Sequence, residues 1–388
     1  MFSDRTNWKL TPNLFSRIQQ QLREARTPIC DLTVSNPTQC GLPYDEAAVL
    51  AAFQNSSALS YNPQPKGLLV AREAVSRYYR ESHDLPDLDP DAILLTTSTS
   101  EAYSFVFRLL CNPGDEVLVA KPSYPLFDFL ADLQDVKLVP YSLIYAQGWM
   151  IDFSSLAQAI TARTRAILLV HPNNPTGSFV SSEEVGKLNQ ICHAKHLALI
   201  ADEVFLDYSN DASPRKSFAA NHESLTFTLS GLSKISALPQ MKAAWIVTTG
   251  PRDLAEQSLA RLEIISDTFL AMSAPIQLGL PALLDQRKTI QPFLLARIRE
   301  NTQELARQLA LQSACELLHL QGGWSGVLRV PVSQSDEELA IDLLQKQNLL
   351  VHPGHFYDFH QDGYLVFSLI TPPDEFREGI TKLLRHFN

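Results

Sequence analysis

Five short polar stretches of the chain each follow an apolar run, and their residue types could together act on a bound ligand. Residues 97–101 are rich in hydroxyl groups and open a helical pattern, which suits the binding of phosphate by backbone amides. The other stretches offer a ring, an amide, a carboxylate and an amine, on Tyr124, Asn174, Asp202 and Lys234. Because ligands of open α/β sheets bind beyond the carboxyl ends of the strands, we expect these groups to meet in one crevice.

The lysine lies in the stretch SGLSKISALPQMKAAW, residues 230–245, where the next charged residue after Lys234 is Lys242. Apolar runs that read as buried strands flank this stretch on both sides. A lysine ammonium is expensive to bury unless it is paired or chemically committed. A chemical role for Lys234 is therefore favoured over a surface lysine in a loop.

Pyridoxal phosphate is a cofactor that needs this set of groups. A lysine forms a Schiff base with it, and a carboxylate keeps the pyridine nitrogen protonated so that the ring can accept carbanion electrons. An amide donates to the phenolate oxygen, an aromatic ring stacks on the pyridine, and a loop binds the phosphate. No metal site is expected, because His193 and His196 lack a partnering carboxylate or cysteine nearby.

Seven apolar runs, alternating with helical patterns, must position these groups. They are residues 92–97, 116–120, 137–143, 166–170, 197–201, 225–229 and 243–247. Most are rich in Val, Ile and Leu without polar alternation, which is typical of strands buried on both faces of a parallel sheet. The sequence therefore predicts an α/β fold, with a mainly parallel seven-stranded sheet and helices on both faces.

The pattern changes after about residue 285 to long helices, short strands and a final helix, which indicates a smaller α+β domain. The N-terminal segment, with its prolines and short apolar pieces, is expected to pack against it. We expect residues 1–50 to form an arm and part of the small domain. Residues 51–284 then form the large cofactor-binding domain, and residues 285–388 form the small C-terminal domain.

Composition and charge exclude some classes of binding partner. The chain of 388 residues has a formal net charge of −10 and a pI near 5.5, which opposes a nucleic-acid or anionic-membrane surface. No apolar run approaches the ~20 residues of a membrane span, and the N-terminus lacks the pattern of a signal peptide. The five scattered cysteines, without a C-x-x-C pair, are typical of thiols in a reducing compartment. A cytoplasmic protein is expected.

Five blocks of the sequence resemble the class I/II aminotransferases of the pyridoxal-phosphate fold type I (aspartate aminotransferase-like) superfamily. In chain order they are YNPQPKGLLVAREAV, NPGDEVLVAKPSYP, NNPTG, ADEVF and GLSKISALPQMK. Asn-Pro-Thr-Gly alone is also a good turn sequence. Five blocks in the family's order and spacing, covering nearly the whole chain, make the resemblance specific.

The resemblance implies a role for each matching residue. Lys234 would form the Schiff base and shuttle the proton, Asp202 would pair with the pyridine nitrogen, Asn174 would bond the ring oxygen, and Tyr124 would stack on the ring. The residues matching the phosphate ligands are Ser98, Thr99, Ser100, Ser233 and Lys242. Tyr61 resembles the tyrosine that reaches the phosphate of the neighbouring subunit, which implies a homodimer with shared active sites.

Each of these residues also has a plainer interpretation. Asp202 could cap a helix or turn, and Ser100 could cap the helix that follows it. Tyr124 could be a core aromatic beneath a loop, which competes closely with stacking. Tyr61 is the weakest of the set, since an exposed tyrosine before NPQP needs no ligand. His171 is interpreted as a polar residue behind the Asn-Pro turn rather than as an acid or base.

The chain departs from the family pattern at three positions. Lys242 stands where arginine usually clamps the phosphate, so the charge remains but the bidentate fork is lost. Phe205 replaces a tyrosine that donates to the ring oxygen, so a more basic Schiff base is expected. Val366 stands where an arginine usually binds the substrate carboxylate.

Without that arginine, the carboxylate is expected to rest on amides near Ser35 and on Asn174, or on a histidine, His355 or His360. Alternatively, the substrate is an amine or a modified amino acid without an α-carboxylate. Weak activity with aspartate or glutamate follows from either case.

The leading functional prediction is an aminotransferase that moves an amino group between a small-molecule amino donor and a keto acid through Lys234. The alternative is a C–S/β-elimination lyase or a decarboxylase on the same fold, because the fold does not fix which bond to Cα breaks. A regulatory protein that has kept the fold is opposed by the short N-terminal arm, the acidic balance and the retained Lys234, Asp202 and Asn174.

Overall fold

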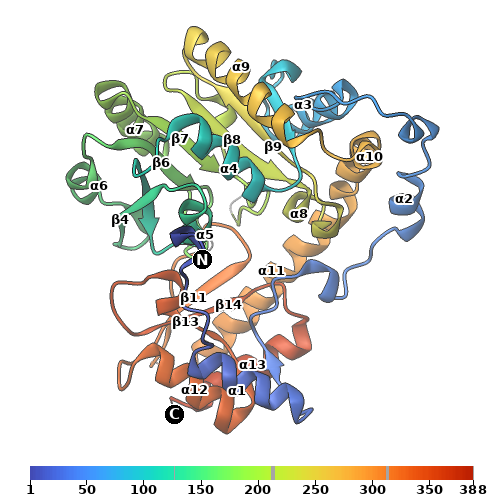
Figure 1. Cartoon of the computed structure of the whole chain (residues 1–388). Helices are drawn as coiled ribbons and strands as arrows, with labels where there is room; N and C mark the ends of the chain where they lie inside the picture. Colours follow the sequence, from blue (N-terminus) through green and yellow to red (C-terminus); the bar gives the residue numbers. More distant parts are fainter. Residues whose placement is uncertain (126, 211–214, 312–313, 388) are drawn as a thin grey trace.

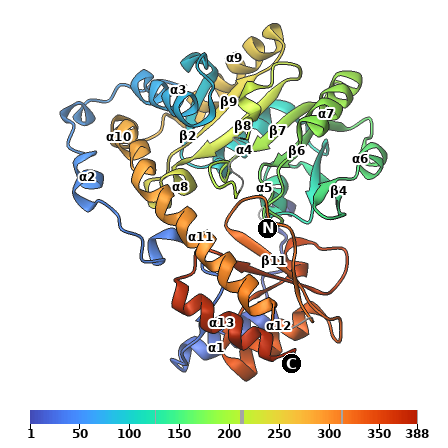
Figure 2. The same cartoon turned by 180° about the vertical axis from the view of Figure 1, so that it is seen from behind.

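The computed structural model describes residues 1–125, 127–210, 215–311 and 314–387. A large sheet with helices around it forms the upper part of the molecule in Figure 1, and a small sheet with its own helices forms the lower part. The long helix α11 (Arg287–Leu309) runs from one part to the other, as Figure 2 shows from behind. Among the described residues, no helix combines the length and apolar character that crossing a membrane requires.

The large sheet has eight strands. In spatial order they are β2 (Ile93–Thr96), β9 (Ala244–Thr249), β8 (Thr226–Gly231), β7 (Ala198–Asp202), β6 (Thr164–Val170), β3 (Glu116–Lys121), β4 (Lys137–Tyr145) and β5 (Trp149–Ile151). The strands β8, β7, β6, β3 and β4 run parallel, while β9 is antiparallel to both of its neighbours and β5 to β4. All seven predicted runs form strands, and the mainly parallel α/β sheet is confirmed. The expected count of seven was too low, because β5 is only three residues long.

Helices cover both faces of this sheet, so adjacent strand residues enter different cores. Leu94 and Ile246 pack into one core with α4, while Leu95 and Trp245 pack into another with α3. The helices of this part are α3 (Leu69–His83), α4 (Thr99–Leu110), α5 (Phe127–Asp132), α6 (Phe153–Ala159), α7 (Ser182–Lys195), α8 (Leu232–Ile235), α9 (Arg252–Phe269) and α10 (Ala274–Asp285). Double-sided burial explains why the strands read as continuous apolar runs.

The lower part is built on a small antiparallel sheet. Its strands, in spatial order, are β10 (Glu316–Leu317), β11 (Ser325–Arg329), β14 (Tyr364–Ser368) and β13 (His352–Pro353).

The remaining helices of the two parts are α1 (Leu14–Glu24), α2 (Glu46–Ala51), α12 (Asp336–Gln347) and α13 (Pro373–Arg385). Short 3₁₀ turns are η1 (Asp4–Thr6), η2 (Pro37–Gln39), η3 (Ser56–Leu59), η4 (Pro90–Ala92), η5 (Phe218–Ala220), η6 (Pro239–Met241) and η7 (Gly354–Tyr357).

The N-terminal segment joins this lower part through backbone pairing. The strand β1 (Cys30–Asp31) runs parallel to β12 (Leu349–Leu350), and Leu32 is fully buried in the core that contains Leu343 and Leu383. Two regions far apart in sequence thus share a separate two-stranded sheet and one core. The boundaries at residues 50 and 284 stay a prediction.

Candidate active site

A cavity of about 510 Å³ lies between the carboxyl ends of the large sheet and the small sheet. This volume falls in the range of roughly 300–1,000 Å³ that is usual for small-molecule sites. Most of the predicted site residues line it: Ser35, Ser98, Thr99, Ser100, Tyr124, Asn174, Asp202, Ser233, Lys234, Lys242 and Val366. The strand order therefore brings together groups that are spread over more than three hundred positions of the sequence.

Lys234 lies on the short helix α8, directly after β8, and hydrogen bonds to nearby carbonyls fix this helix. Tyr208 Oη donates to the carbonyl of Lys234 itself at 2.6 Å. Gln291 Nε2 donates to Ile235 O at 2.9 Å, and Tyr44 Oη donates to Ala237 O at 2.7 Å. Because these three donors come from separate elements, α8 is held from several sides and the direction of the lysine is set.

The Lys234 ammonium has an apolar environment. Its Nζ atom lies 4.8 Å from the ring centre of Trp324 and 5.4 Å from that of Phe205. Burial lowers the pKa of Lys234 to about 8, although Asp202 acts in the opposite direction. An amine with this pKa is partly unprotonated near neutral pH, which a nucleophile or base requires.

Asp202 is the last residue of β7 and is only 7% exposed. Its Oδ2 accepts from Tyr103 Oη at 2.8 Å and its Oδ1 accepts from the Val204 amide at 3.0 Å. Burial raises the pKa of Asp202, while these hydrogen bonds and Lys234 lower it. The two donors orient the carboxylate and leave it lone pairs for a further donor in the cavity.

Tyr103 was missed as a supporting residue in the sequence. It lies on the buried face of α4, four residues after Thr99, and is 2% exposed. The helical period would have placed it against the sheet, but its contact with Asp202 joins positions 99 residues apart. Only the packing of α4 on the sheet reveals that contact.

The hydroxyl-rich loop opens α4 as predicted. Ser98 caps the helix, because its Oγ accepts from the Glu101 amide at 3.2 Å, and Glu101 Oε2 accepts from the Thr97 amide at 2.7 Å. The first turn of a helix has amides without intrahelical acceptors, which makes it a natural anion site. The capping role expected for Ser100 thus belongs to Ser98, and Ser100 lines the cavity within the first turn.

Asn174 and Tyr124 face the cavity from two loops of the large sheet. Asn174 Oδ1 accepts from Ser325 Oγ at 3.3 Å, which links the large sheet to the small one. Tyr124 is 41% exposed, so packing inside a core does not describe its position. The ring of Tyr124 meets that of Phe127 edge-on, and partial burial of its side chain raises the pKa of Tyr124.

His171 lies behind the turn that carries Asn174. It is buried, and its Nδ1 accepts from the Val180 amide.

Tyr61 is the predicted cofactor-binding residue that lies elsewhere. It is 82% exposed and does not line the cavity of its own chain. It follows η3 on the segment that carries α2, which stands at the outer edge of the upper part in Figures 1 and 2. Within one chain, Tyr61 therefore does not contribute to the wall of this cavity.

The histidines expected to replace the missing arginine are corrected by the structure. His355 and His360 are both exposed, neither lines the cavity, and His360 Nε2 instead lies 3.2 Å from Ser142 Oγ. The histidine on the cavity wall is His352, on β13. A weak signal for His352 was its position directly after the apolar run of residues 349–351. That His352 lies beside Val366 could not be recognised before the strands β13 and β14 were paired.

The groups on the wall fit pyridoxal phosphate. Lys234, Asp202 and Asn174 supply an amine, a buried carboxylate and an amide, and the α4 amides with Lys242 offer the donors and the positive charge that a phosphate needs. The cavity volume of about 510 Å³ leaves room for the cofactor. The residues therefore match the cofactor in charge, polarity and space.

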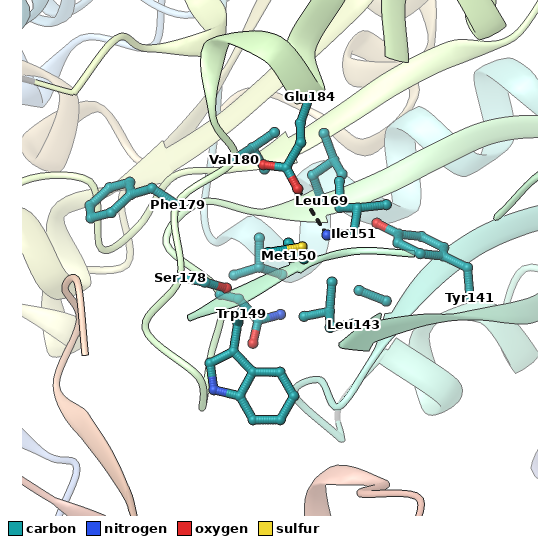
Figure 3. A pocket seen from close by; sticks show the side chains of 13 residues that line it. Tyr141, Leu143, Trp149, Met150, Ile151, Leu169, Ser178, Phe179, Val180 and Glu184 are labelled. Carbon is teal, nitrogen blue, oxygen red and sulfur yellow. Dashed lines mark hydrogen bonds between the residues drawn. The ribbon is translucent and has the colours of Figure 1, made fainter. Parts of the chain in front are cut away.

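A second hollow, shown in Figure 3, is much smaller, about 20 Å³. It lies between β4, β5 and β6, and Glu184 is the carboxylate on its wall. That carboxylate accepts from the Ile151 amide at 2.8 Å and from the Ser181 amide at 2.8 Å, and Ser181 and Glu184 form the capping box that begins α7. The carboxylate of Glu184 is thus engaged in structural hydrogen bonds. We therefore take the cavity of about 510 Å³ as the candidate functional site.

The sequence matches the family model of aminotransferase class I and II over residues 27–383. Among curated proteins it is 26% identical over 374 residues to the glutamate–pyruvate aminotransferase AlaA of Haemophilus influenzae, covering 94% of this chain and 92% of that protein. It is also 26% identical over 352 residues to an alanine aminotransferase of Mycobacterium bovis, covering 89% and 82% of the two chains.

Solved structures share the fold. An alanine aminotransferase from Pyrococcus furiosus superposes with a TM-score of 0.88 at 20% identity, covering all of this chain and 99% of the other. An aminotransferase from Escherichia coli gives a TM-score of 0.86 at 23% identity, with 99% and 97% covered. The overall fold of the chain is thus shared with these proteins.

Proposed function

The chain belongs to the aminotransferase class I and II family, and we propose that Lys234 is the residue that carries its pyridoxal phosphate and moves the substrate proton. The protein is a pyridoxal-phosphate-dependent aminotransferase acting on an amino acid and a keto acid. The observation that carries the proposal is the position of Lys234, an amine with a pKa near 8 on the wall of a cavity that it shares with Asp202 and the α4 loop.

When bound, the cofactor supplies an electron sink for the carbanion formed at the substrate Cα. Asp202, oriented by Tyr103 and the Val204 amide, would hold a proton on the pyridine nitrogen. The amides of Ser98, Thr99 and Ser100, with Ser233 and Lys242, would bind the phosphate. Tyr124 would pack on the ring, and Asn174, whose Oδ1 accepts from Ser325 Oγ, would donate from Nδ2 to the ring oxygen.

With cofactor and substrate bound, the neutral amine of Lys234 would take the proton from the substrate Cα and hold it for return. This is the proton movement that transfer of the amino group requires before water releases the keto acid. Burial against Trp324 and Phe205 keeps the pKa of this amine low enough for the neutral form to be present. The relatives' transaminase identities favour this outcome over elimination or decarboxylation.

A homodimer is part of the proposal. Tyr61 is remote from its own cavity, and large apolar side chains near it are exposed, with Leu50 at 65% and Leu59 at 91%. Such exposure on one segment is typical of an interaction surface. A second subunit covering this segment would bring its cavity to Tyr61. Full activity of a species that sediments as a monomer would contradict the shared site.

Borohydride reduction of the purified yellow protein tests the assignment of the lysine. We expect peptide mass mapping to find the reduced cofactor on Lys234, and addition of an amino donor before reduction to prevent the labelling. A stoichiometric pyridoxamine form after adding the donor would show transfer, whereas a free keto acid with ammonia would show elimination. A label on any other lysine would overturn the proposal.

A further inference from the structure

His352 and Val366 are direct neighbours on the small sheet. The strands β13 and β14 are antiparallel, and His352 pairs with Val366 in register. Residues directly opposite each other in such a pair project to the same face, with Cβ atoms about 5 Å apart. Both line the cavity. The imidazole therefore stands beside the position where the family pattern places an arginine.

A hydroxyl group holds this imidazole. Tyr357 Oη lies 3.0 Å from His352 Nδ1, and the Tyr357 carbonyl accepts from the Ser123 amide at 2.9 Å, next to Tyr124. When the hydroxyl donates to Nδ1, the ring proton lies on Nε2, which is then a hydrogen-bond donor. Burial lowers the pKa of His352, while the Asp31 carboxylate acts in the opposite direction, so burial favours the neutral ring.

The rest of the lining around His352 carries hydrophobic side chains and uncharged hydroxyl groups. The hydrophobic residues are Val204, Phe205, Trp324, Phe356, Val366 and Phe367, and the hydroxyl groups include those of Thr33, Ser35, Ser325 and Ser368. Among the described lining residues, the carboxylate and amine side chains are those of Asp202, Lys234 and Lys242, and each has a proposed place at the cofactor. Burying a second carboxylate without a cation is costly. A substrate with two carboxylates is therefore poorly matched to this wall.

We propose that His352, positioned by Tyr357, binds the single carboxylate of the substrate through a neutral hydrogen bond, and that the amino donor is an amino acid with an apolar side chain. This proposal rests on the function proposed above. It assigns the specificity of the site to β13 instead of to the strand position of the family arginine. The hydrophobic residues of this lining receive the side chain of the donor.

Two simple ligands separate the parts of this recognition. 3-Phenylpropionate carries the carboxylate and an apolar group without an amine, and 2-phenylethylamine carries the amine without a carboxylate. Their binding to the cofactor-loaded enzyme is measured by calorimetry and by the ~420 nm band of the lysine-bound cofactor. His352→Ala should weaken 3-phenylpropionate on the order of tenfold or more, as loss of a hydrogen bond to a charged group implies, and leave 2-phenylethylamine within about twofold.

Matched variants complete the test. His355→Ala, on the exposed neighbour, should leave both ligands unchanged, and His352→Gln, which keeps a neutral N–H donor, should retain most of the 3-phenylpropionate affinity. Thermal unfolding of each variant reports on folding. Unchanged 3-phenylpropionate binding in His352→Ala, equal loss of both ligands, or a glutamine variant as weak as alanine would overturn the proposal. A wild type without a borohydride label on Lys234 would instead overturn the proposed function.

Discussion

The two walls of the cavity differ in both charge and construction. On the large-sheet wall, Asp202 ends the buried strand β7 and Lys234 follows the buried strand β8. Hydrogen bonds fix the carboxylate of Asp202 and the carbonyl of Lys234. On the small-sheet wall, His352 lies on the two-residue strand β13 beside Val366 of β14, and the described side chains carry no permanent charge. We interpret the difference as a division of tasks. The charged side chains of the large-sheet wall bind the cofactor, and the neutral side chains of the small-sheet wall bind the substrate.

Replacement of Lys234 should have the largest effect. Lys234→Ala removes both the covalent attachment and the base, and loss of a positioned base alone costs about 10²–10⁴-fold in rate. We expect turnover to become undetectable in a steady-state assay while circular dichroism stays unchanged. Lys346→Ala, on an exposed helix position paired with Asp342, is the matched control and should be fully active. Substantial turnover by Lys234→Ala would remove the lysine from the mechanism.

Asp202→Asn should come next. The amide keeps the shape but cannot hold a proton on the pyridine nitrogen, and losing such electrostatic stabilisation costs on the order of 10²-fold in kcat. Steady-state kinetics measure the loss. The control is Glu203→Gln, because Glu203 is equally buried but bonds Ser217 and Phe218 outside the cavity wall. If the two variants lost activity equally, the effect of Asp202 would be one of folding.

Lys242→Ala tests the outer edge of the cofactor wall. The side chain contributes a point charge to the phosphate, so its loss should weaken cofactor binding by about 1.5–3 kcal/mol. Lys242→Arg should keep the affinity, since the charge remains. Equilibrium dialysis of the apoenzyme against pyridoxal phosphate gives the constants. Equal affinity in the alanine variant would show that the side chain points away from the phosphate.

The smallest effect is expected at Phe205. Phe205→Tyr adds a donor beside Lys234 that can stabilise the ring oxygen, which favours the charged form of that oxygen. The spectroscopic pKa of the cofactor-bound enzyme should fall by about one unit or less, equivalent to about 1.4 kcal/mol. A pH titration of the ~420 nm band measures it. An unchanged midpoint would place the new hydroxyl out of reach of the ring.

The large-sheet wall was predictable because its signals are local. Buried runs mark the strands, and the residue after each run falls at the ligand edge, which located Asp202, Asn174 and Lys234 on the cavity. The reversed direction of β9 and the short β5 leave no such mark in the sequence. They depend on which strands pair, and pairing is a long-range choice.

The small-sheet wall was harder to predict for the same physical reason. The strand β13 has two residues, too few for a period to be read, and its register with β14 decides that His352 reaches the cavity. His355 and His360 lie in the same stretch of sequence and differ from His352 only in how the chain folds there. The choice among the three histidines was therefore not available from residue type and spacing.

The contrast between a charged cofactor wall and a neutral substrate wall is tested most directly by spectral titration of the wild-type enzyme with amino donors. Leucine and phenylalanine, aspartate and glutamate are added in turn, and the loss of the ~420 nm band is followed. We expect the apolar donors to react at lower concentration, and aspartate and glutamate to require concentrations well above ~1 mM, the upper end of common KM values. Efficient reaction of aspartate at micromolar concentration would contradict the account and require a cation on the small-sheet wall.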